Sequence, residues 1–111
     1  MNVNFNGYGE NIATFIANST LTETGVPVKI TADGTVSKCS ANDSFCGICV
    51  AVRDGYAAVQ LSGYVKVQTT AKLALGYTKL AAAAGGKVAA YDSGRALLVI
   101  DSTATEAGII L

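Results

Sequence analysis

The residues of this chain best suited to chemistry are two cysteines three positions apart, Cys46 and Cys49, in the stretch SFCGICV at 44–50. A Cys-x-x-Cys pair can form a redox-active dithiol or supply two of the four ligands of a zinc site. A third cysteine, Cys39, lies a short way upstream. Which of these roles is open to the thiols depends on the backbone that carries them.

The backbone around the pair is predicted to form a β-hairpin. Residues 57–68, AAVQLSGYVKVQ, alternate apolar and polar side chains with the period of two that is typical of a strand with one buried face. The stretch GICVAV at 47–52 forms the preceding strand, and the Asp-Gly at 54–55 forms the turn between them. Gly63 predicts a bulge or a sharp bend, as when a small sheet curls into a barrel.

The alternation also predicts which side chains share a face. The even-numbered positions of 57–68 form a wet face, consisting of Gln60, Ser62, Tyr64, Lys66 and Gln68. On the preceding strand two faces are predicted, one with Ile48, Val50 and Val52 and the other with Cys49, Ala51 and Arg53. Side chains three apart in a strand point to opposite faces, so Cys46 and Cys49 could neither chelate one metal nor close a disulfide without a break in the strand.

Neither chemical role of the cysteines has further support. A thioredoxin-like thiol needs a helix N-terminus to lower its pKa, and no helix is predicted after Cys49. A zinc site needs four ligands, whereas the chain has no His and only Cys39 as a third thiol. We therefore interpret all three cysteines as buried packing residues.

Turn signals recur along the rest of the chain and predict an all-β fold. Asp33-Gly34 is a hairpin signal, and further turns are predicted at 84–88 and 92–96. The remaining strands are predicted at 11–17, 26–31, 87–91, 96–101 and 108–111. Because proline cannot donate to a ladder, Pro27 places its strand at a sheet edge or begins it.

The alanine-rich segment 69–86 is ambiguous, because alanine favours helix but Gly76 and the Gly85-Gly86 pair interrupt it. It is predicted to form a loop or a single helical turn, followed by a short strand. The fold prediction is a small single-domain β-barrel or β-sandwich of short strands over 11–111. A flexible N-terminal arm is predicted at 1–10.

Composition argues against several classes of function. The eight Lys and Arg balance the eight Asp and Glu and are scattered, so no nucleic-acid partner is predicted. No apolar run approaches the roughly 18–20 residues that span a bilayer, so no membrane partner is predicted. The chain has no His, the commonest general base near neutral pH. We expect neither an enzyme nor a cofactor.

Four residues are candidates for contact with other proteins. Phe5 and Tyr8 are the large side chains of the Asn- and Gly-rich stretch 1–10, and aromatic side chains commonly anchor interfaces. Tyr64 and Lys66 lie on the predicted wet face, which is either solvated or in contact with a neighbouring subunit. The closing IIL at 109–111 is predicted to lie in the core or at a subunit interface, because exposure would cost up to about 1.5–3 kcal/mol per side chain.

The order of these motifs resembles that of the small capsid decoration, or cement, proteins of tailed bacteriophages and prophages. The similar stretches are GVPVKITADGTVSKC at 25–39, FCGICVAVRDGYAAVQLSGYVKV at 45–67, AKLALGYTKLAAAAGGKVAA at 71–90 and ALLVIDSTATEAGIIL at 96–111. The Cys-x-x-Cys is not part of that family's pattern, which agrees with a packing role for the thiols.

The resemblance implies a β-barrel-like structural protein of the virion, made in the host cytoplasm, that binds the outer surface of a phage head and stabilises the capsid lattice. Its implied partners are the major capsid protein and further copies of itself, in a homo-oligomer that is often a trimer. The residues alone leave a second class open, a non-catalytic binding module such as a carbohydrate-binding β-sandwich. Five tyrosines support that alternative, and the absence of Trp counts against it.

Overall fold

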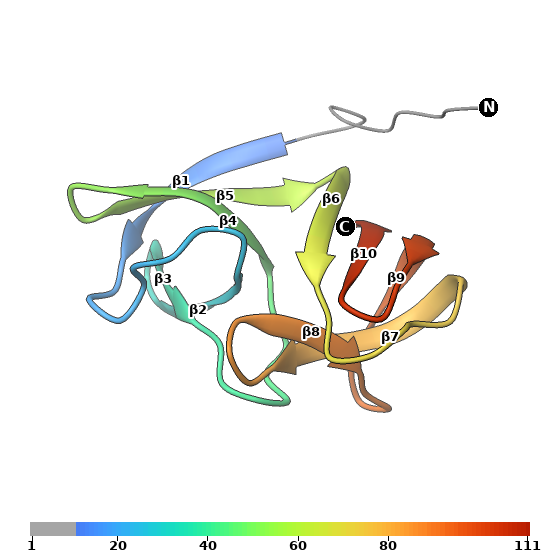
Figure 1. The fold of residues 1–111 in the computed structure, drawn as a ribbon. Helices are drawn as coiled ribbons and strands as arrows, with labels where there is room; N and C mark the ends of the chain where they lie inside the picture. Colours follow the sequence, from blue (N-terminus) through green and yellow to red (C-terminus); the bar gives the residue numbers. More distant parts are fainter. Residues whose placement is uncertain (1–10) are drawn as a thin grey trace.

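The computed structural model describes residues 11–111, which form ten β-strands (Figure 1). The strands are β1 (Asn11–Ala17), β2 (Pro27–Ala32), β3 (Thr35–Lys38), β4 (Gly47–Arg53), β5 (Tyr56–Ser62), β6 (Tyr64–Gln68), β7 (Gly76–Ala83), β8 (Lys87–Ala90), β9 (Arg95–Ser102) and β10 (Glu106–Ile110). The all-β prediction is confirmed for this part of the chain. Nowhere in 11–111 is there a helix long and apolar enough to cross a membrane. The predicted arm at 1–10, with Phe5 and Tyr8, lies outside the described residues.

Five strands close into a barrel in the order β1-β3-β2-β4-β5. Both predicted Asp-Gly hairpins belong to it, since Asp33-Gly34 joins β2 to β3 and Asp54-Gly55 joins β4 to β5. Asp54 and Gly55 have positive φ angles of 53° and 80°, as a two-residue type I′ turn requires. β1 completes the barrel by pairing in parallel with β3 and antiparallel with β5. Pro27 is the first residue of β2, which is one of the two predicted placements.

The other five strands form a second sheet in the order β6-β10-β9-β7-β8. The chain passes into it from the barrel at Gly63, whose φ of 91° favours glycine. The predicted strand at 57–68 is therefore two strands, β5 and β6, with the predicted bend between them. A parallel bridge between Thr69 and Val88 joins the two edges of this sheet, which curls back on itself (Figure 1).

Because the chain turns a corner at Gly63, only part of the predicted wet (polar) face is exposed to solvent. Lys66 is exposed, whereas Gln60 and Tyr64 are buried, with 2% and 8% of their surface accessible. The Gln60 side-chain Nε2 donates to the carbonyl oxygens of Ser62 and Tyr64 at 3.0 and 2.9 Å. These hydrogen bonds offset the cost of burying the amide. The prediction of an exposed face is thus wrong at Gln60 and Tyr64, because the chain turns where a straight strand would have left both in water.

A β-bulge also alters the faces predicted for β4. The register between β4 and β5 shifts between Cys49 and Ala51, so Val50 turns outward and is exposed. Ile48 packs in the core of the second sheet, whereas Val52 packs against the core of the barrel. The prediction that these residues share one face is wrong, because an extra residue reverses the alternation beyond it.

Two apolar clusters hold the fold together. The barrel core consists of Leu21, Val26, Val28, Val36, Cys49, Ala57 and Val59. The core of the second sheet also contains Cys39, Phe45 and Ile48, which come from the barrel half of the chain. The loop at Asn42 and Asp43 strengthens this joint, because its backbone pairs with Ala82 of β7 through hydrogen bonds of 2.8 and 2.9 Å. The second sheet therefore packs directly onto the barrel.

The ambiguous segment 69–86 contains a loop followed by β7 and its turn, without the helical turn that was one predicted alternative. Ala81 and Ala82 are buried in β7, between β8 on one side and the 42–43 loop on the other. Strand pairing on two sides thus outweighs the helix propensity of these alanines. At the C-terminus, Ile109 is buried in the core of the second sheet, in agreement with the core placement predicted for it.

Candidate functional site

The cysteines pack in the two cores as free thiols. Cys49 lies in the barrel core, Cys46 packs against the same cluster, and Cys39 belongs to the core of the second sheet. Cys46 and Cys49 do not have the opposite orientation that was predicted, because β4 begins at Gly47 and Cys46 precedes it. Within residues 11–111, no group of three or more His, Cys, Asp or Glu side chains could hold a metal ion.

The surroundings of the thiols suppress their ionisation. Burial, with a smaller contribution from the Asp43 carboxylate, raises the pKa of the Cys39 thiol to about 12. Burial likewise raises the pKa of Cys46 and of Cys49. Because the thiolate is the nucleophilic form of cysteine, none of the three is activated at neutral pH. The arrangement supports packing rather than dithiol chemistry.

We expect the thiols of the native protein to react slowly with Ellman's reagent at about pH 8. A pKa of about 12 for Cys39 leaves about a thousandfold less thiolate than in an unfolded chain, where the pKa is about 8.5. The measurement follows the release of thionitrobenzoate before and after unfolding in guanidinium chloride. Unfolded protein, in which all three thiols should react fast, is the control. A thiol that reacts equally fast in both states would contradict a buried placement.

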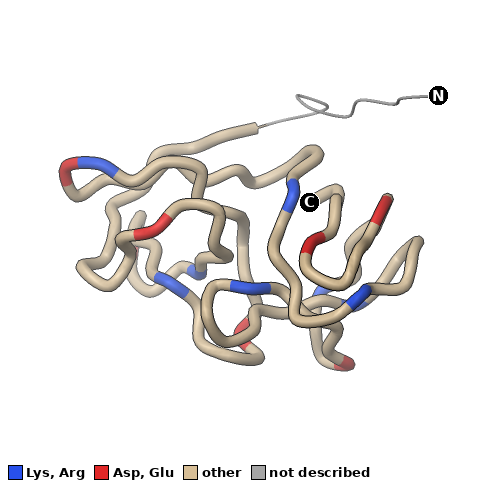
Figure 2. The backbone as a smooth tube through the Cα atoms, viewed as in Figure 1, with Lys and Arg blue, Asp and Glu red and all other residues tan. Residues whose placement is uncertain are grey.

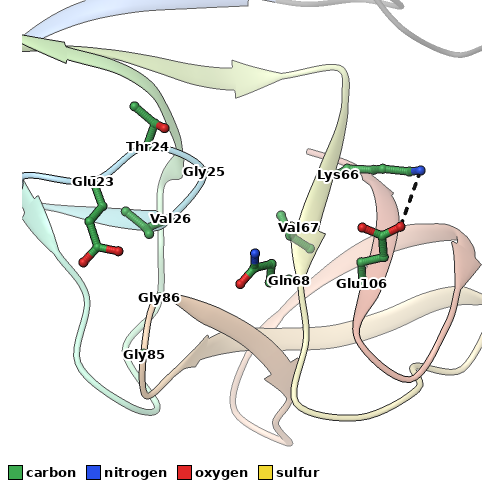
Figure 3. A pocket seen from close by; sticks show the side chains of 10 residues that line it. All are labelled: Glu23, Thr24, Gly25, Val26, Lys66, Val67, Gln68, Gly85, Gly86 and Glu106. Carbon is green, nitrogen blue, oxygen red and sulfur yellow. Dashed lines mark ion pairs between the residues drawn. The ribbon is translucent and has the colours of Figure 1, made fainter.

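Of the two predicted contact residues that the structure describes, only Lys66 is on the surface. Tyr64 is buried, and its ring lies so close to Gly108 that a side chain there would collide with it. Burial, followed by the Asp101 carboxylate, raises the pKa of the Tyr64 hydroxyl. Lys66 is exposed, with Nζ 3.7 Å from Oε1 of Glu106 (Figure 3). Tyr64 is therefore a packing residue, and its placement on an exposed contact face is corrected.

Charged side chains of both signs are distributed over the two sheets and their loops (Figure 2). Several form ion pairs, including Lys29 with Asp43 at 2.6 Å and Lys38 with Glu23 at 3.1 Å. Surface ion pairs of this kind contribute little to folding stability. Because charges of both signs are interspersed, they produce no long-range electrostatic field of one sign. Contacts with a partner would accordingly depend on shape and apolar area more than on electrostatic steering.

A cleft of about 300 Å³ lies between the barrel and β6 (Figure 3). One wall is the stretch 23–26, the other is β6 from Lys66 to Gln68, and the β7–β8 turn at 85–86 closes one end. Two buried valines, Val26 and Val67, provide its apolar part. The cleft joins segments far apart in the chain, so no local spacing in the sequence could have revealed it.

The barrel carries an apolar area on the outer face of β1 and β5. Ile16 and Tyr56 are cross-strand partners, and 52% and 58% of their surface is exposed. Ile12, on the same face of β1, is also exposed. The sequence does not reveal this area, because the exposed Ile12 and Ile16 and the more buried Phe15 are all apolar and only strand pairing distinguishes them.

A shallow hollow on the second sheet brings an aromatic ring together with polar groups. It is lined by Thr78, Lys79, Ala90, Tyr91 and Asp92. A sugar-binding site would combine a tyrosine ring with hydrogen-bonding neighbours, and this hollow has both. It holds one aromatic side chain, and the exposed Tyr77 of β7 is not part of its lining.

Comparison with protein-family models and with curated proteins finds no match. Among solved structures, the chain is similar to "The crystal structure of head fiber gp8.5 N base in bacteriophage phi29", with a TM-score of 0.60 and 14% sequence identity. The similarity covers 92% of this chain and 93% of that chain, so it includes both the barrel and the second sheet. At this level of identity the two proteins share a fold.

Proposed function

We propose that this chain is a structural protein of a bacteriophage virion that binds the outer surface of the head and stabilises the capsid lattice. The observation that carries the proposal is the similarity over nearly the whole chain to the N base of a phage head fiber. The order of sequence motifs, which resembles capsid decoration proteins, supports the same kind of particle independently. The proposed partners are the major capsid protein and further copies of the chain, for example in a trimer.

The physical character of the molecule suits this role. The core of the second sheet includes side chains from the barrel half of the chain, and backbone hydrogen bonds connect the 42–43 loop to β7, so the two sheets form a stiff unit. The exposed pair Ile16 and Tyr56 provides apolar contact area of the kind found at protein interfaces. On a lattice, many identical weak contacts add up through multivalency. The proposal assigns no catalytic role and no cofactor to the chain.

The direct test is co-sedimentation of the purified full chain with heads of the phage or prophage whose genome encodes it. We expect the chain to pellet with these heads and to saturate at a fixed number of copies per capsid subunit, because a lattice offers equivalent sites. Heads of an unrelated phage control for non-specific adsorption. A chain that stays in the supernatant with its own heads over a range of salt concentrations would overturn the proposal.

The same assay tests whether the barrel's outer face makes the contact. We expect the double variant Ile16→Ser/Tyr56→Ser to bind heads about tenfold more weakly or worse, since aromatic and apolar anchors dominate interface energies. Tyr77→Ser removes an even more exposed ring from the second sheet and is expected to bind as the parent does. Thermal unfolding checks that the variants are folded. Equal binding by both variants would place the contact on another face.

A further inference from the structure

β6 is an edge strand of the second sheet, and its residues from Lys66 to Gln68 line the cleft. Hydrogen bonds from Leu111 N to Gly63 O and from Thr69 N to Thr105 O, at 3.0 and 2.9 Å, set its register with β10. Because hydrogen-bonded residues alternate in an antiparallel pair, the N–H and C=O of Lys66 point away from β10. On that side the Tyr64 carbonyl oxygen accepts from Gln60 Nε2, and Thr69, just beyond the end of β6, bridges to Val88. Within the described chain, the β6 backbone groups open to a further strand are therefore those of Lys66 and Gln68.

The cleft beside this edge is suited to an extended peptide. An unpaired edge is a template for another strand, and peptides commonly bind by adding one to a sheet. Three glycines, Gly25, Gly85 and Gly86, line the cleft without side chains to block the backbone groups (Figure 3). Val26 and Val67 add an apolar surface, and the volume of about 300 Å³ is at the lower end of the range for ligand sites.

The stretch 1–10 has the sequence of such a peptide. Residues 2–6, NVNFN, alternate polar and apolar side chains with the period of a strand. In an added strand, Val3 and Phe5 would lie on one face and the three asparagines on the other. Ten extended residues span up to about 33 Å, whereas the five residues of β6 need about 17 Å. The stretch is therefore long enough to cover the edge and to connect to a neighbouring molecule.

The chain's own N-terminal stretch leaves from the edge of β5 opposite the cleft, so it would have to cross the β5–β6 corner to enter it. β5 pairs with β1 on one edge and with β4 on the other. The cleft is on the β4 side, because the Gly25 N–H in its wall donates to the Cys49 carbonyl oxygen of β4 at 2.6 Å. Asn11 lies on the β1 side, where its Nδ2 donates to Ser62 Oγ at 2.8 Å. A second copy is the better donor of the strand.

We propose that residues 1–10 of one copy add as a strand to the β6 edge of a second copy, with Val3 and Phe5 on the same face of the enlarged sheet as Val67. Each molecule then donates one strand and accepts one. Such a head-to-tail contact forms a closed ring, a trimer for example, when the rotation between copies closes. The inference rests on the proposed self-association and does not depend on binding to phage heads.

The first test compares Lys66→Pro with Lys66→Thr in the full chain by sedimentation equilibrium. Proline removes the N–H that faces the cleft, while β6 keeps its hydrogen bonds to β10, which Lys66 does not make. Threonine changes the side chain and keeps the N–H, so it is the matched control. We expect Lys66→Thr to associate like the parent and Lys66→Pro to associate about tenfold more weakly, the effect of one buried acceptor left unpaired. Equal association of the two variants would overturn the proposal.

A second test keeps β6 unaltered, so it also decides the matter if Lys66→Pro fails to fold. A photo-crosslinking p-benzoylphenylalanine replaces Tyr8, and chains labelled with ¹⁴N and ¹⁵N are mixed before irradiation. Mass spectrometry should find adducts at 64–68 or 23–26 that join a light chain to a heavy one. Adducts within single chains only, or at other strands, would overturn the proposal. Co-sedimentation with heads is measured separately, so failure here leaves the proposed function standing.

Discussion

Replacing Gly47 by alanine should destabilise the protein more than almost any other single change. Gly47 is buried at the start of β4, and a Cβ there would collide with the carbonyl oxygen of Gln60 and lie 2.8 Å from Val59 Cγ1. The carbonyl belongs to the β5 backbone, so it cannot move aside without opening the ladder. Overpacking of this kind lowers the free energy of unfolding by about 1–3 kcal/mol, and for Gly47→Ala we expect a loss of about 3 kcal/mol. At an m value near 2 kcal/mol/M, the urea midpoint should fall by about 1.5 M.

Gly25→Ala is the matched control for this experiment. It makes the same chemical change, but a Cβ at Gly25 meets nothing within 4 Å. Its φ of 76° still disfavours alanine, at a cost of about 1–2 kcal/mol. We therefore expect a smaller loss for Gly25→Ala than for Gly47→Ala. If Gly47→Ala unfolds at the midpoint of the parent, the close approach of β4 to β5 is contradicted.

The sequence was most informative where one residue type sets the local backbone. Asp54-Gly55 predicted its hairpin correctly, because few other pairs accept two positive φ angles in succession. Gly63 predicted the bend that ends β5, and Pro27 the start of β2. Since an all-β chain is organised by its turns, these positions sufficed for the fold class.

Features set by distant contacts could not be predicted. Nothing local indicates that β1 pairs in parallel with β3 to close a barrel, or that a bulge follows Cys49. The burial of Gln60 depends on carbonyl groups that only the corner at Gly63 brings within reach. Alternation describes the faces of one straight strand, so it fails where the strand bends or gains a residue.

The candidate functional surfaces also divide into features that local residue types predict and features that depend on distant contacts. Residue types predict that Cys46 and Cys49 are packing residues, and the structure places both against the core of the barrel. The alternation predicts Tyr64 on the polar face with Lys66, whereas the structure buries it. The cleft and the exposed pair Ile16 and Tyr56 depend on strand pairing, which no spacing along the chain encodes.

Leu80→Ala should be the most damaging truncation in the core of the second sheet. Leu80 is fully buried and lies where β7 pairs with both β8 and β9. Gly94 packs against its backbone so closely that a Cβ there would collide with it. Truncation to alanine would leave a cavity, and because β8 and β9 hold β7 on both sides, the surrounding residues cannot move in to fill it. We expect a loss of about 3–4 kcal/mol, within the range of about 2–5 for buried Leu→Ala changes, measured by urea unfolding.

Leu75→Ala removes the same atoms from a side chain that is 65% exposed, so it should change stability by less than about 0.5 kcal/mol. Because the chemical change is the same, the difference between the two variants reports mainly on the burial of Leu80. Leu80 shares its cluster with Ile48 of β4, and for that reason Leu80→Ala should shift the whole transition while keeping it two-state. A barrel that stays folded after the second sheet has unfolded in this variant would show that the packing of Ile48 in the second core does not couple them.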